Sequence, residues 1–395
     1  MKTRIKIMQT AFFISLLLIC ISCKPKQHVK LEKSFYYWKT SYDFTKREIA
    51  YADTLGLQRM YVRCFDIDWS ANAAKPVPVG MMNTNRYMQV PFESVTPCVF
   101  ITNTVMEKCS NEELEDLAEK IAEKLNEVFS DFAKSYASET TEKMRDSVNA
   151  LNKKYSQKLR NEVLNKIDWS EKAMEQDWLL RSNEIQIDCD WTEKTKEKYF
   201  FFLKSLKGLV PDKIISCTLR LWQYKNSKKA GVPPVERCML MCYSMGSPKN
   251  YDGKNSIANA EDMGKYLMKA KYSLPLDIAL PIFSWGVLYR KGKFKGILHN
   301  TDISKIQNDT INYKHQTGSF YKYLNDTVIE NTYVRYGDEV KIERVDSTEL
   351  LNIIELIDSS VKLQQKTRIA FFSWDTTYIK QYGVKNFDKY YKSFQ

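Results

Sequence analysis

Eight short apolar segments of strand length recur along the chain at wide spacing, and helical patterns lie between several of them. Strands that alternate with helices run parallel, because each helical crossover brings the chain back to the same end of the sheet. Eight such units predict an α/β fold, a closed (β/α)8 TIM barrel. The segments are 34–40, 59–68, 96–102, 184–191, 214–223, 237–245, 276–285 and 367–375, and helical patterns include 44–55, 111–132, 193–206 and 259–270.

Two segments exceed what a minimal barrel needs, and we expect both to elaborate one domain that covers 34–395. Residues 111–181 are charge-rich and predict a helical insertion after the third strand, with one apolar face on the barrel. Residues 299–346 hold alternating runs separated by the turn signals Asn325-Asp326 and Gly337-Asp338. They predict a small antiparallel β insertion between the seventh and eighth strands. The apolar face of 111–181 comprises Leu114, Leu117, Ile121, Leu125, Val128 and Phe129.

The N-terminus is typical of an export signal. Lys2, Arg4 and Lys6 precede an apolar run, 11–21, that is too short for a membrane span. The sequence Cys20-Ile21-Ser22-Cys23 resembles bacterial lipoprotein signals, in which the final cysteine is acylated and becomes the new N-terminus.

The resemblance to lipoprotein signals implies a signal peptide over 1–22, lipid on Cys23 and a tether over 23–33. We therefore expect the protein to be located in the cell envelope, and at the outer membrane in preference to the inner one. The alternative is an N-terminal anchor that is not cleaved. In that case the lipid on Cys23 is absent and the apolar run itself holds the protein; with the lipid, Cys23 binds the protein to a membrane, which is one of its expected partners.

The formal net charge of +12 is compatible with an anionic partner or with a solvated basic surface. An exported protein has little access to nucleic acid, so we expect none as a partner and keep a glycan as a possible ligand. Beyond Cys23 no CxxC pair occurs, and His28, His299 and His315 lie in expected loops. This pattern favours neither a metal site nor a serine or cysteine nucleophile with a histidine partner, and we expect no cofactor.

Seven cysteines follow Cys23, and six of them lie in or beside apolar strand-like runs. An odd number at such positions indicates buried thiols and not a disulfide framework. They are Cys64, Cys98, Cys109, Cys189, Cys217, Cys238 and Cys242.

Carboxylates are concentrated where two expected strands end, which is where the loops of such barrels build their sites. Asp66 and Asp68 end the second strand, and Asp188 and Asp190 end the fourth. Because side chains alternate, Asp188 and Asp190 share the inward face about 7 Å apart, close enough to raise one pKa. The alternative is a buried ion-pair network with Arg63 and Arg220.

The fourth strand resembles that of the family 18 glycoside hydrolases, the chitinase-like barrels, which carry DxxDxDxE. Asp188 and Asp190 match the second and third aspartates, but the first falls on Ile185 and the glutamate that protonates the glycosidic oxygen falls on Thr192. The chain also resembles bacterial envelope proteins with an I-Q-hydrophobic-D-x-D fourth strand, a likeness that implies a fold and no reaction. Further matches to the chitinase-like barrels are Met241-Cys242-Tyr243, Pro281 with Trp285, Trp374, and the insertion before the last strand.

The resemblance implies a glycan pocket in which Asp190 and Tyr243 hold an acetamido group, although Thr192 cannot act as the acid. We therefore expect a glycan-binding barrel without the usual catalytic glutamate. The alternatives are a hydrolase with a relocated acid, Glu193 or Asp375, and a non-catalytic envelope scaffold. Trp38 and Trp222 can also stack on sugar or fill the core. The catalytic candidates are Asp188, Asp190 and Glu193, and the expected ligand-binding residues are Asp66, Asp68, Asp188, Asp190, Tyr243, Trp285, Trp374 and Asp375.

Overall fold

The computed structural model describes residues 30–83, 89–150, 157–268, 270–299, 303–329 and 332–394. The expected signal peptide and Cys23 lie outside these ranges, so their assignments remain predictions. Among the residues described, no helix is both long enough and apolar enough to cross a membrane.

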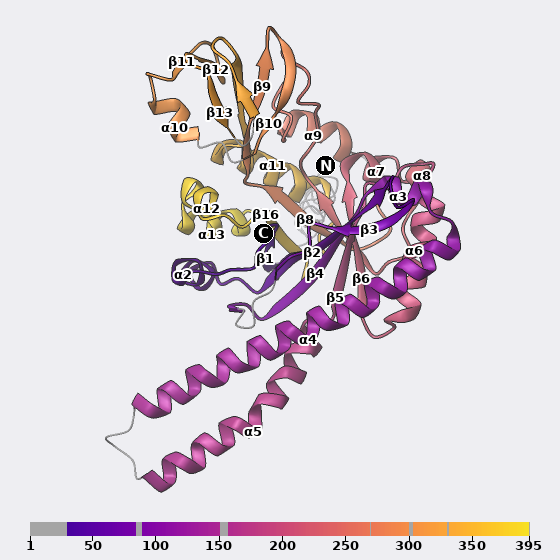
Figure 1. The fold of residues 1–395 in the computed structure, drawn as a ribbon, viewed down its shortest axis with the longest axis vertical. Coiled ribbons are helices and arrows are strands. Elements are labelled where there is room, and N and C mark those ends of the chain that lie inside the picture. The colour runs from indigo at the N-terminus through magenta and orange to yellow at the C-terminus, as the bar shows by residue number, and fades with distance from the viewer. Residues whose placement is uncertain are drawn as a thin grey trace, which may run out of the picture.

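A closed barrel of eight parallel strands confirms the predicted fold (Figure 1). The strands, in chain order, are β1 (Glu32–Tyr37), β2 (Arg59–Ser70), β4 (Ser94–Ile101), β5 (Glu184–Asp188), β6 (Ile214–Arg220), β7 (Arg237–Met241), β8 (Leu276–Pro281) and β16 (Arg368–Phe372). Strand β1 pairs with both β16 and β2, which closes the ring. The far end of β2 extends beyond the ring and pairs antiparallel with β3 (Lys75–Val79).

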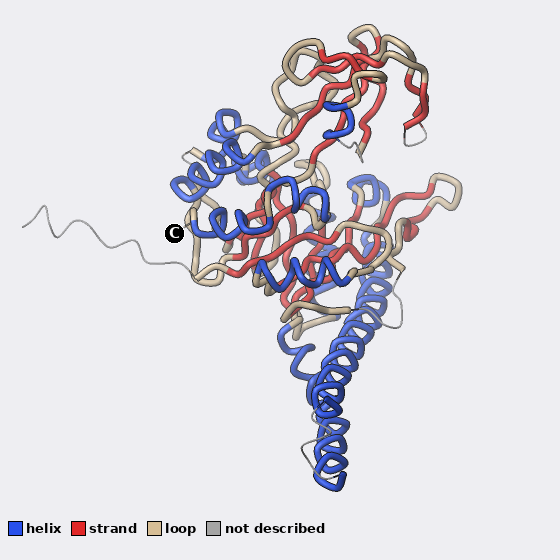
Figure 2. The backbone as a smooth tube through the Cα atoms, turned by 90° about the vertical axis from the view of Figure 1, so that its left-hand side faces the viewer, coloured by secondary structure: helices blue, strands red, loops and turns tan. Residues whose placement is uncertain are grey.

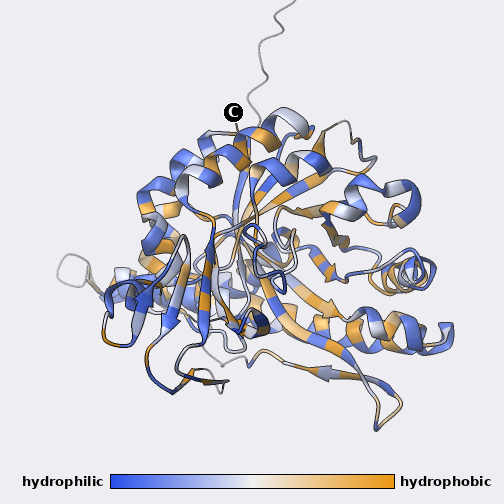
Figure 3. Cartoon of the chain, turned by 90° about the horizontal axis from the view of Figure 1, so that it is seen from above, coloured by the Kyte–Doolittle hydropathy of each residue, from blue (hydrophilic) through white to orange (hydrophobic). Residues whose placement is uncertain are grey.

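Helices surround the barrel when it is viewed from above (Figure 3). The first shows why they begin and end where they do: Thr45 and Glu48 form a reciprocal capping box, and Gly56 ends the helix in the left-handed region at φ 59°. These helices are α2 (Lys46–Leu55), α3 (Asn103–Lys108), α6 (Lys196–Leu209), α7 (Leu221–Lys225), α8 (Ser227–Ala230), α9 (Ala260–Leu267), α11 (Ser347–Ser360), α12 (Thr376–Tyr382), the short 3₁₀ turn η1 (Val384–Asn386) and α13 (Phe387–Lys392).

Strand alternation separates two apolar layers. In β5, Ile185 and Ile187 belong to the large core between the strands and the helices, whereas Gln186 accepts a hydrogen bond from the hydroxyl of Tyr36, 2.6 Å away inside the barrel. The interior has its own small cluster, which fills the middle of the barrel. Its buried members are Tyr36, Tyr61, Cys98, Met239, Ala279 and Ala370.

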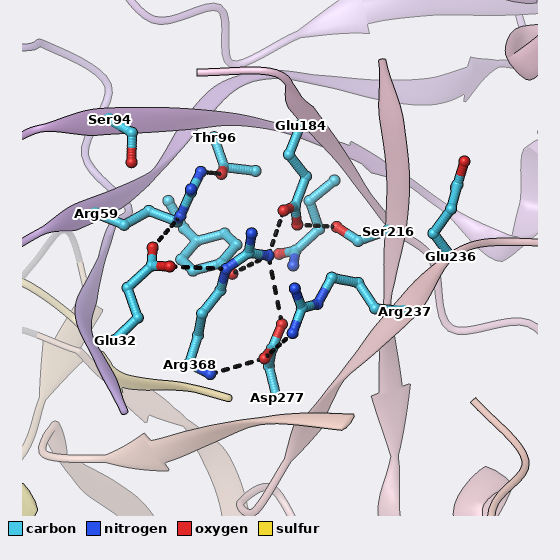
Figure 4. Close-up of polar contacts among 12 residues, drawn as sticks. Glu32, Arg59, Ser94, Thr96, Glu184, Ser216, Glu236, Arg237, Asp277 and Arg368 are labelled. Atoms are coloured by element: carbon cyan, nitrogen blue, oxygen red, sulfur yellow. Dashed lines mark hydrogen bonds and ion pairs between the residues drawn. The ribbon is translucent and has the colours of Figure 1, made fainter. Parts of the chain in front are cut away.

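Below this cluster, six charged side chains close the N-terminal end of the barrel (Figure 4). Arg368 contacts Glu184 and also approaches Asp277, and Arg237 donates to Asp277 at 2.7 Å. Arg59 pairs with Glu32. Burial raises the pKa of Asp277 to about 6, although the charges of Arg368 and Arg237 lower it. Three arginines thus face three carboxylates, which balances the buried charge.

A long helical hairpin follows β4 and projects away from the barrel, as the charge-rich segment predicted (Figures 1 and 2). It consists of α4 (Asn111–Ala150) and α5 (Gln157–Arg181). The predicted apolar face of α4 is buried from Leu114 to Phe129. Near the barrel the two helices are joined by Phe132 and Trp178, whose rings stack with centroids 6.1 Å apart.

The antiparallel insertion between β8 and β16 is confirmed, but it starts earlier than expected. Barrel strand β8 ends at Pro281, and the segment that begins at Ser284 already belongs to the insertion, where it pairs with the strand at Glu339–Arg344. A five-stranded sheet comprises β9 (Ser284–Arg290), β10 (Lys293–Leu298), β11 (Tyr313–His315), β12 (Phe320–Tyr323) and β15 (Glu339–Arg344); α10 (Ile303–Asn308) and the hairpin β13 (Thr327–Ile329) and β14 (Thr332–Val334) complete the insertion.

Candidate functional site

The polar residues at the C-terminal end of the barrel gather around Asp188, the last residue of β5. Its carboxylate accepts a 2.6 Å hydrogen bond from the hydroxyl of Thr218 on the neighbouring strand β6. Burial raises the pKa of Asp188 to about 7; the Thr218 bond lowers it, and the charges of Asp190 and Asp66 raise it further. A carboxyl with a pKa raised this far can donate or accept a proton near neutral pH.

Asp190 lies two residues further along and forms an ion pair with Arg220, with 2.7 Å between Oδ2 and the guanidinium nitrogen. Both side chains remain about 40% exposed, 42% for Asp190 and 40% for Arg220, so the pair is open to a ligand. Burial raises the pKa of Asp190, while Arg220 lowers it. The Arg220 backbone N–H donates to Gln223 at 2.7 Å, which fixes the start of α7.

The two aspartates of β2 have different surroundings. Asp66 is held by Arg63, whose Nε lies 2.7 Å from Oδ1, and the Arg63 guanidinium lies over the ring of Trp38 at 5.7 Å. Asp68 instead accepts hydrogen bonds from the hydroxyl of Thr102, at 2.7 Å, and from the Trp69 backbone N–H, at 2.8 Å. Asp66 thus interacts electrostatically with Asp188, whereas Asp68 joins the ends of β2 and β4.

Beyond Asp190, the segment that follows β5 has a threonine, Thr192, at the position of the family 18 glutamate. The Thr192 backbone N–H donates to the hydroxyl of Thr195, 2.9 Å away, and the two hydroxyls lie 3.3 Å apart. Glu193 is exposed. Thr192 begins the turn that leads into α6, so the chain is no longer a strand at the position where the family 18 pattern has its glutamate.

An aromatic group lies beside the aspartates, and the sequence did not point to its central member. The ring of Phe372 is 5.3 Å from that of Tyr243 and 5.6 Å from that of Trp38. Phe283 lies 5.7 Å from Phe372 and 5.2 Å from Trp285. Counting in steps of two from the inward-facing Ala370 identifies Phe372 as an interior residue.

Three expected ligand-binding residues are placed differently. The expectation that Trp374 lines the pocket is wrong: it is 1% exposed and packs against Phe35, at 5.2 Å, in the core between strands and helices. Trp285 belongs to β9, and its Nε1 donates to Glu343 of β15 at 3.0 Å. Asp375 caps α12 by accepting from the Thr377 N–H at 2.7 Å.

A cleft of about 990 Å³ opens beside the Asp190–Arg220 pair, over the ends of β5, β6 and β7. We call it the β5–β7 cleft. Its lining residues are Glu107, Asp190, Trp191, Thr192, Glu193, Lys194, Arg220, Leu221, Trp222, Gln223, Tyr243, Ser244, Met245 and Tyr266.

Metal-ligand chemistry is not suggested by the side chains in the part of the chain that the structure describes, where no three His, Cys, Asp or Glu residues are grouped to hold an ion. All seven cysteines after Cys23 are buried there as free thiols. Burial raises the pKa of Cys64 to about 12 and that of Cys109 to about 11, which keeps these thiols protonated at neutral pH.

No protein-family model matches this sequence, and no curated protein matches it. Several solved structures are similar in fold. The spore cortex-lytic enzyme SleL of Bacillus cereus has 12% identity and a TM-score of 0.47, covering 94% of this chain and 76% of its own. The catalytic domain of a chitinase from Pyrococcus furiosus has 10% identity and a TM-score of 0.35, covering 93% and 97%.

The xylanase and α-amylase inhibitor protein XAIP-II of Scadoxus multiflorus has 12% identity and a TM-score of 0.32, covering 71% of this chain and 87% of its own. The barrel assignment rests on the strand pairing of this chain, and no reaction follows from these likenesses.

Proposed function

We propose that this protein is an exported, lipid-anchored envelope protein whose barrel mouth binds a glycan without hydrolysing it. The export signal and the Cys20-Ile21-Ser22-Cys23 pattern support the anchor. The residues at the barrel mouth support a glycan as the ligand, because carboxylates that can form hydrogen bonds lie next to aromatic rings. A sugar presents hydroxyl groups at its edge and C–H groups on its faces, so it needs both kinds of contact.

One observation carries the non-hydrolytic half of the proposal. Glycosidic bond cleavage needs an acid within hydrogen-bond reach of the leaving oxygen. At the position where the family 18 pattern has its glutamate, this chain has Thr192, whose backbone N–H and hydroxyl both contact Thr195. General acid catalysis contributes about 10²- to 10⁴-fold in rate, so without it binding persists while turnover falls towards background.

The remaining parts match recognition of an acetamido sugar. Asp190 keeps a partly exposed carboxylate beside Tyr243, and burial raises the pKa of Tyr243 well above its usual value, which keeps its hydroxyl a proton donor. Asp188 lies close enough to Asp190 for their charges to interact, and the Phe372 ring lies beside that of Tyr243. Together they provide a donor, an acceptor and an apolar surface.

Two other functions have specific support. Glu193 lines the cleft with an exposed carboxyl, which favours an active hydrolase with a relocated acid. Asp375 is less suited to that role because it caps α12. The ion pairs Arg63–Asp66 and Arg220–Asp190 favour a scaffold whose mouth needs no ligand.

A glycan-binding panel separates these possibilities. The purified full-length protein is tested by calorimetry against neutral and acidic oligosaccharides of envelope and dietary origin, together with Asp190→Ala and the control Asp168→Ala. Asp168 also pairs with an arginine, Arg145, but on the projecting hairpin. We expect binding that is lost only in Asp190→Ala. If the protein binds none of the glycans, the proposal is contradicted and the scaffold function is favoured.

A further inference from the structure

The β5–β7 cleft extends the mouth in one direction, over α7. Its inner end is the Asp190–Arg220 pair with Tyr243, and its outer part is lined by Trp222 of α7 and Tyr266 of α9. At about 990 Å³ it lies at the upper end of the 300–1,000 Å³ typical of small-molecule sites. A single sugar ring at Asp190 leaves most of this space empty.

Trp222 is presented to the cleft by a rigid support. Its neighbours Leu221, Gln223 and Tyr224 are buried, whereas Trp222 is 42% exposed. Gln223 fixes α7 from beneath: its amide nitrogen donates to the Trp191 carbonyl at 2.9 Å, and its amide oxygen accepts from the Arg220 N–H. An indole held in this way is a preformed flat surface that loses little conformational entropy when a ligand stacks on it.

The rest of the wall contains both apolar and polar groups. Met245 and Tyr266 add apolar surface, and the ammonium of Lys225 lies 5.6 Å from the Tyr266 ring. Thr192 and Ser244 supply hydroxyl groups. Side chains of both kinds along one groove match the faces and edges of successive sugar rings.

The charge of the cleft restricts the kind of sugar. Three carboxylates, Glu107, Asp190 and Glu193, line the cleft with two cations, Lys194 and Arg220, and a third cation, Lys225, lies beside Tyr266 at its wall. The charges of the cleft are therefore balanced, although the whole chain carries +12. A polyanionic glycan gains no net attraction here, so a neutral glycan is favoured.

We infer that the β5–β7 cleft binds a neutral oligosaccharide of several residues, with one sugar at Asp190 and Tyr243 and the next ones stacked on Trp222. This inference rests on the proposed function, because it assumes that the mouth binds sugar. It adds the length of the ligand, its charge and the direction in which it leaves the barrel.

The test measures affinity against chain length by calorimetry on the full-length protein. The probes are the neutral N-acetylated series from chitobiose to chitotetraose, the neutral cello- and xylo-oligosaccharides of the same lengths, and the acidic tetramer of galacturonic acid. The variants are Trp222→Ala and the control Trp169→Ala, whose indole is 86% exposed on the distant α5. In the wild-type protein we expect affinity to rise about tenfold from dimer to tetramer for a neutral series, with no binding of the acidic tetramer.

Trp222→Ala should abolish this gain with chain length, and Trp169→Ala should leave it unchanged. If a dimer binds but Trp222→Ala keeps the full gain with length, the cleft inference is wrong and the mouth proposal stands. Preferential binding of the acidic tetramer also overturns the inference. Absence of binding by every sugar overturns both.

Discussion

Arg368 of β16 and Glu184 of β5 form an ion pair across the inside of the barrel, although the two strands are not neighbours in the sheet. The Arg368 side chain is 6% exposed and that of Glu184 is not exposed at all. Burial opposes the charged form of Glu184, but Arg368 and Arg59 lower its pKa below the usual value. The pair thus links opposite sides of the ring through its interior.

Replacing Arg368 with methionine should destabilise the barrel strongly. The change leaves Glu184 and Asp277 buried without their main cation, which typically costs about 3–5 kcal/mol. Urea unfolding followed by circular dichroism measures the loss. The control is Arg145→Met, which removes an exposed ion pair and should cost no more than about 1 kcal/mol. Equal effects of the two variants would contradict a structural role for the buried network.

The raised pKa of Asp188 predicts a pH-dependent stability. Its folded value of about 7 lies above the ordinary aspartate value near 3.9, so the folded state holds a proton that the unfolded state releases between these two values. The contribution of Asp188 to stability is therefore full below about pH 4, falls as pH rises to about 7, and then stays constant. The total loss is up to about 4 kcal/mol.

Measuring the unfolding free energy of wild type and Asp188→Asn from pH 4 to 9 checks this prediction. The asparagine variant should become the more stable of the two as pH rises through the window. Thr218→Val removes the hydrogen bond that lowers the pKa, so it should move the upper end of the window to higher pH. A difference between wild type and Asp188→Asn that does not vary with pH would refute the assignment.

No appreciable hydrolysis of chitooligosaccharides is expected from the native protein, because Thr192 cannot protonate the leaving oxygen. Release of reducing ends is the measurement, and Thr192→Glu against Thr192→Gln is the complementary pair. Hydrolysis gained only with glutamate would show that the rest of the pocket is functional. Native turnover at an ordinary enzymatic rate would instead identify a relocated acid, and Glu193→Gln and Asp375→Asn would distinguish the two candidates.

Lipid attachment predicts that Cys23→Ser releases the protein from membranes or leaves it uncleaved. Fractionation and incorporation of a labelled fatty acid into the protein produced in a bacterial host test this, with Cys20→Ser as the control that should behave like the parent. If Cys23→Ser remains in the membrane fraction with its signal removed, the anchor is elsewhere.

The thiols after Cys23 should be free but unreactive. All seven are buried in the folded protein, so a small alkylating reagent should modify them slowly until the chain unfolds. Mass spectrometry of the unreduced, unfolded protein should then show most of the seven alkylated. Two or more disulfides would contradict this prediction.

The barrel was predictable because all eight strands bury apolar side chains against the helices, and this pattern is local in sequence. The residues at which the strands end were harder to predict. The segment 184–191 continues to alternate after β5 stops at Asp188, and 214–223 includes the start of α7 at Leu221. Beyond the last hydrogen bond between paired strands, the sequence still alternates polar and apolar residues, but the chain no longer forms a strand.

The same limit explains the errors in the site. Trp374 was expected in the pocket from the resemblance to the chitinase-like barrels, but β16 ends at Phe372 and Trp374 packs in the outer core. Only two residues separate β8 from β9, so their apolar runs merged into one expected strand. Asp188 and Asp190 lie close together, as expected, because Asp188 ends β5 and Asp190 follows two residues later; their role in binding stays a prediction.

The direction of β1 also determines how an anchored molecule would stand on a membrane. Only eight residues separate Cys23 from Glu32, where β1 begins at the end of the barrel closed by the charged network. A chain of that length spans at most about 30 Å even when fully extended. Lipid on Cys23 would therefore keep the closed end near the bilayer and turn Asp190 and the β5–β7 cleft outward, towards polymers too large to approach the lipid surface.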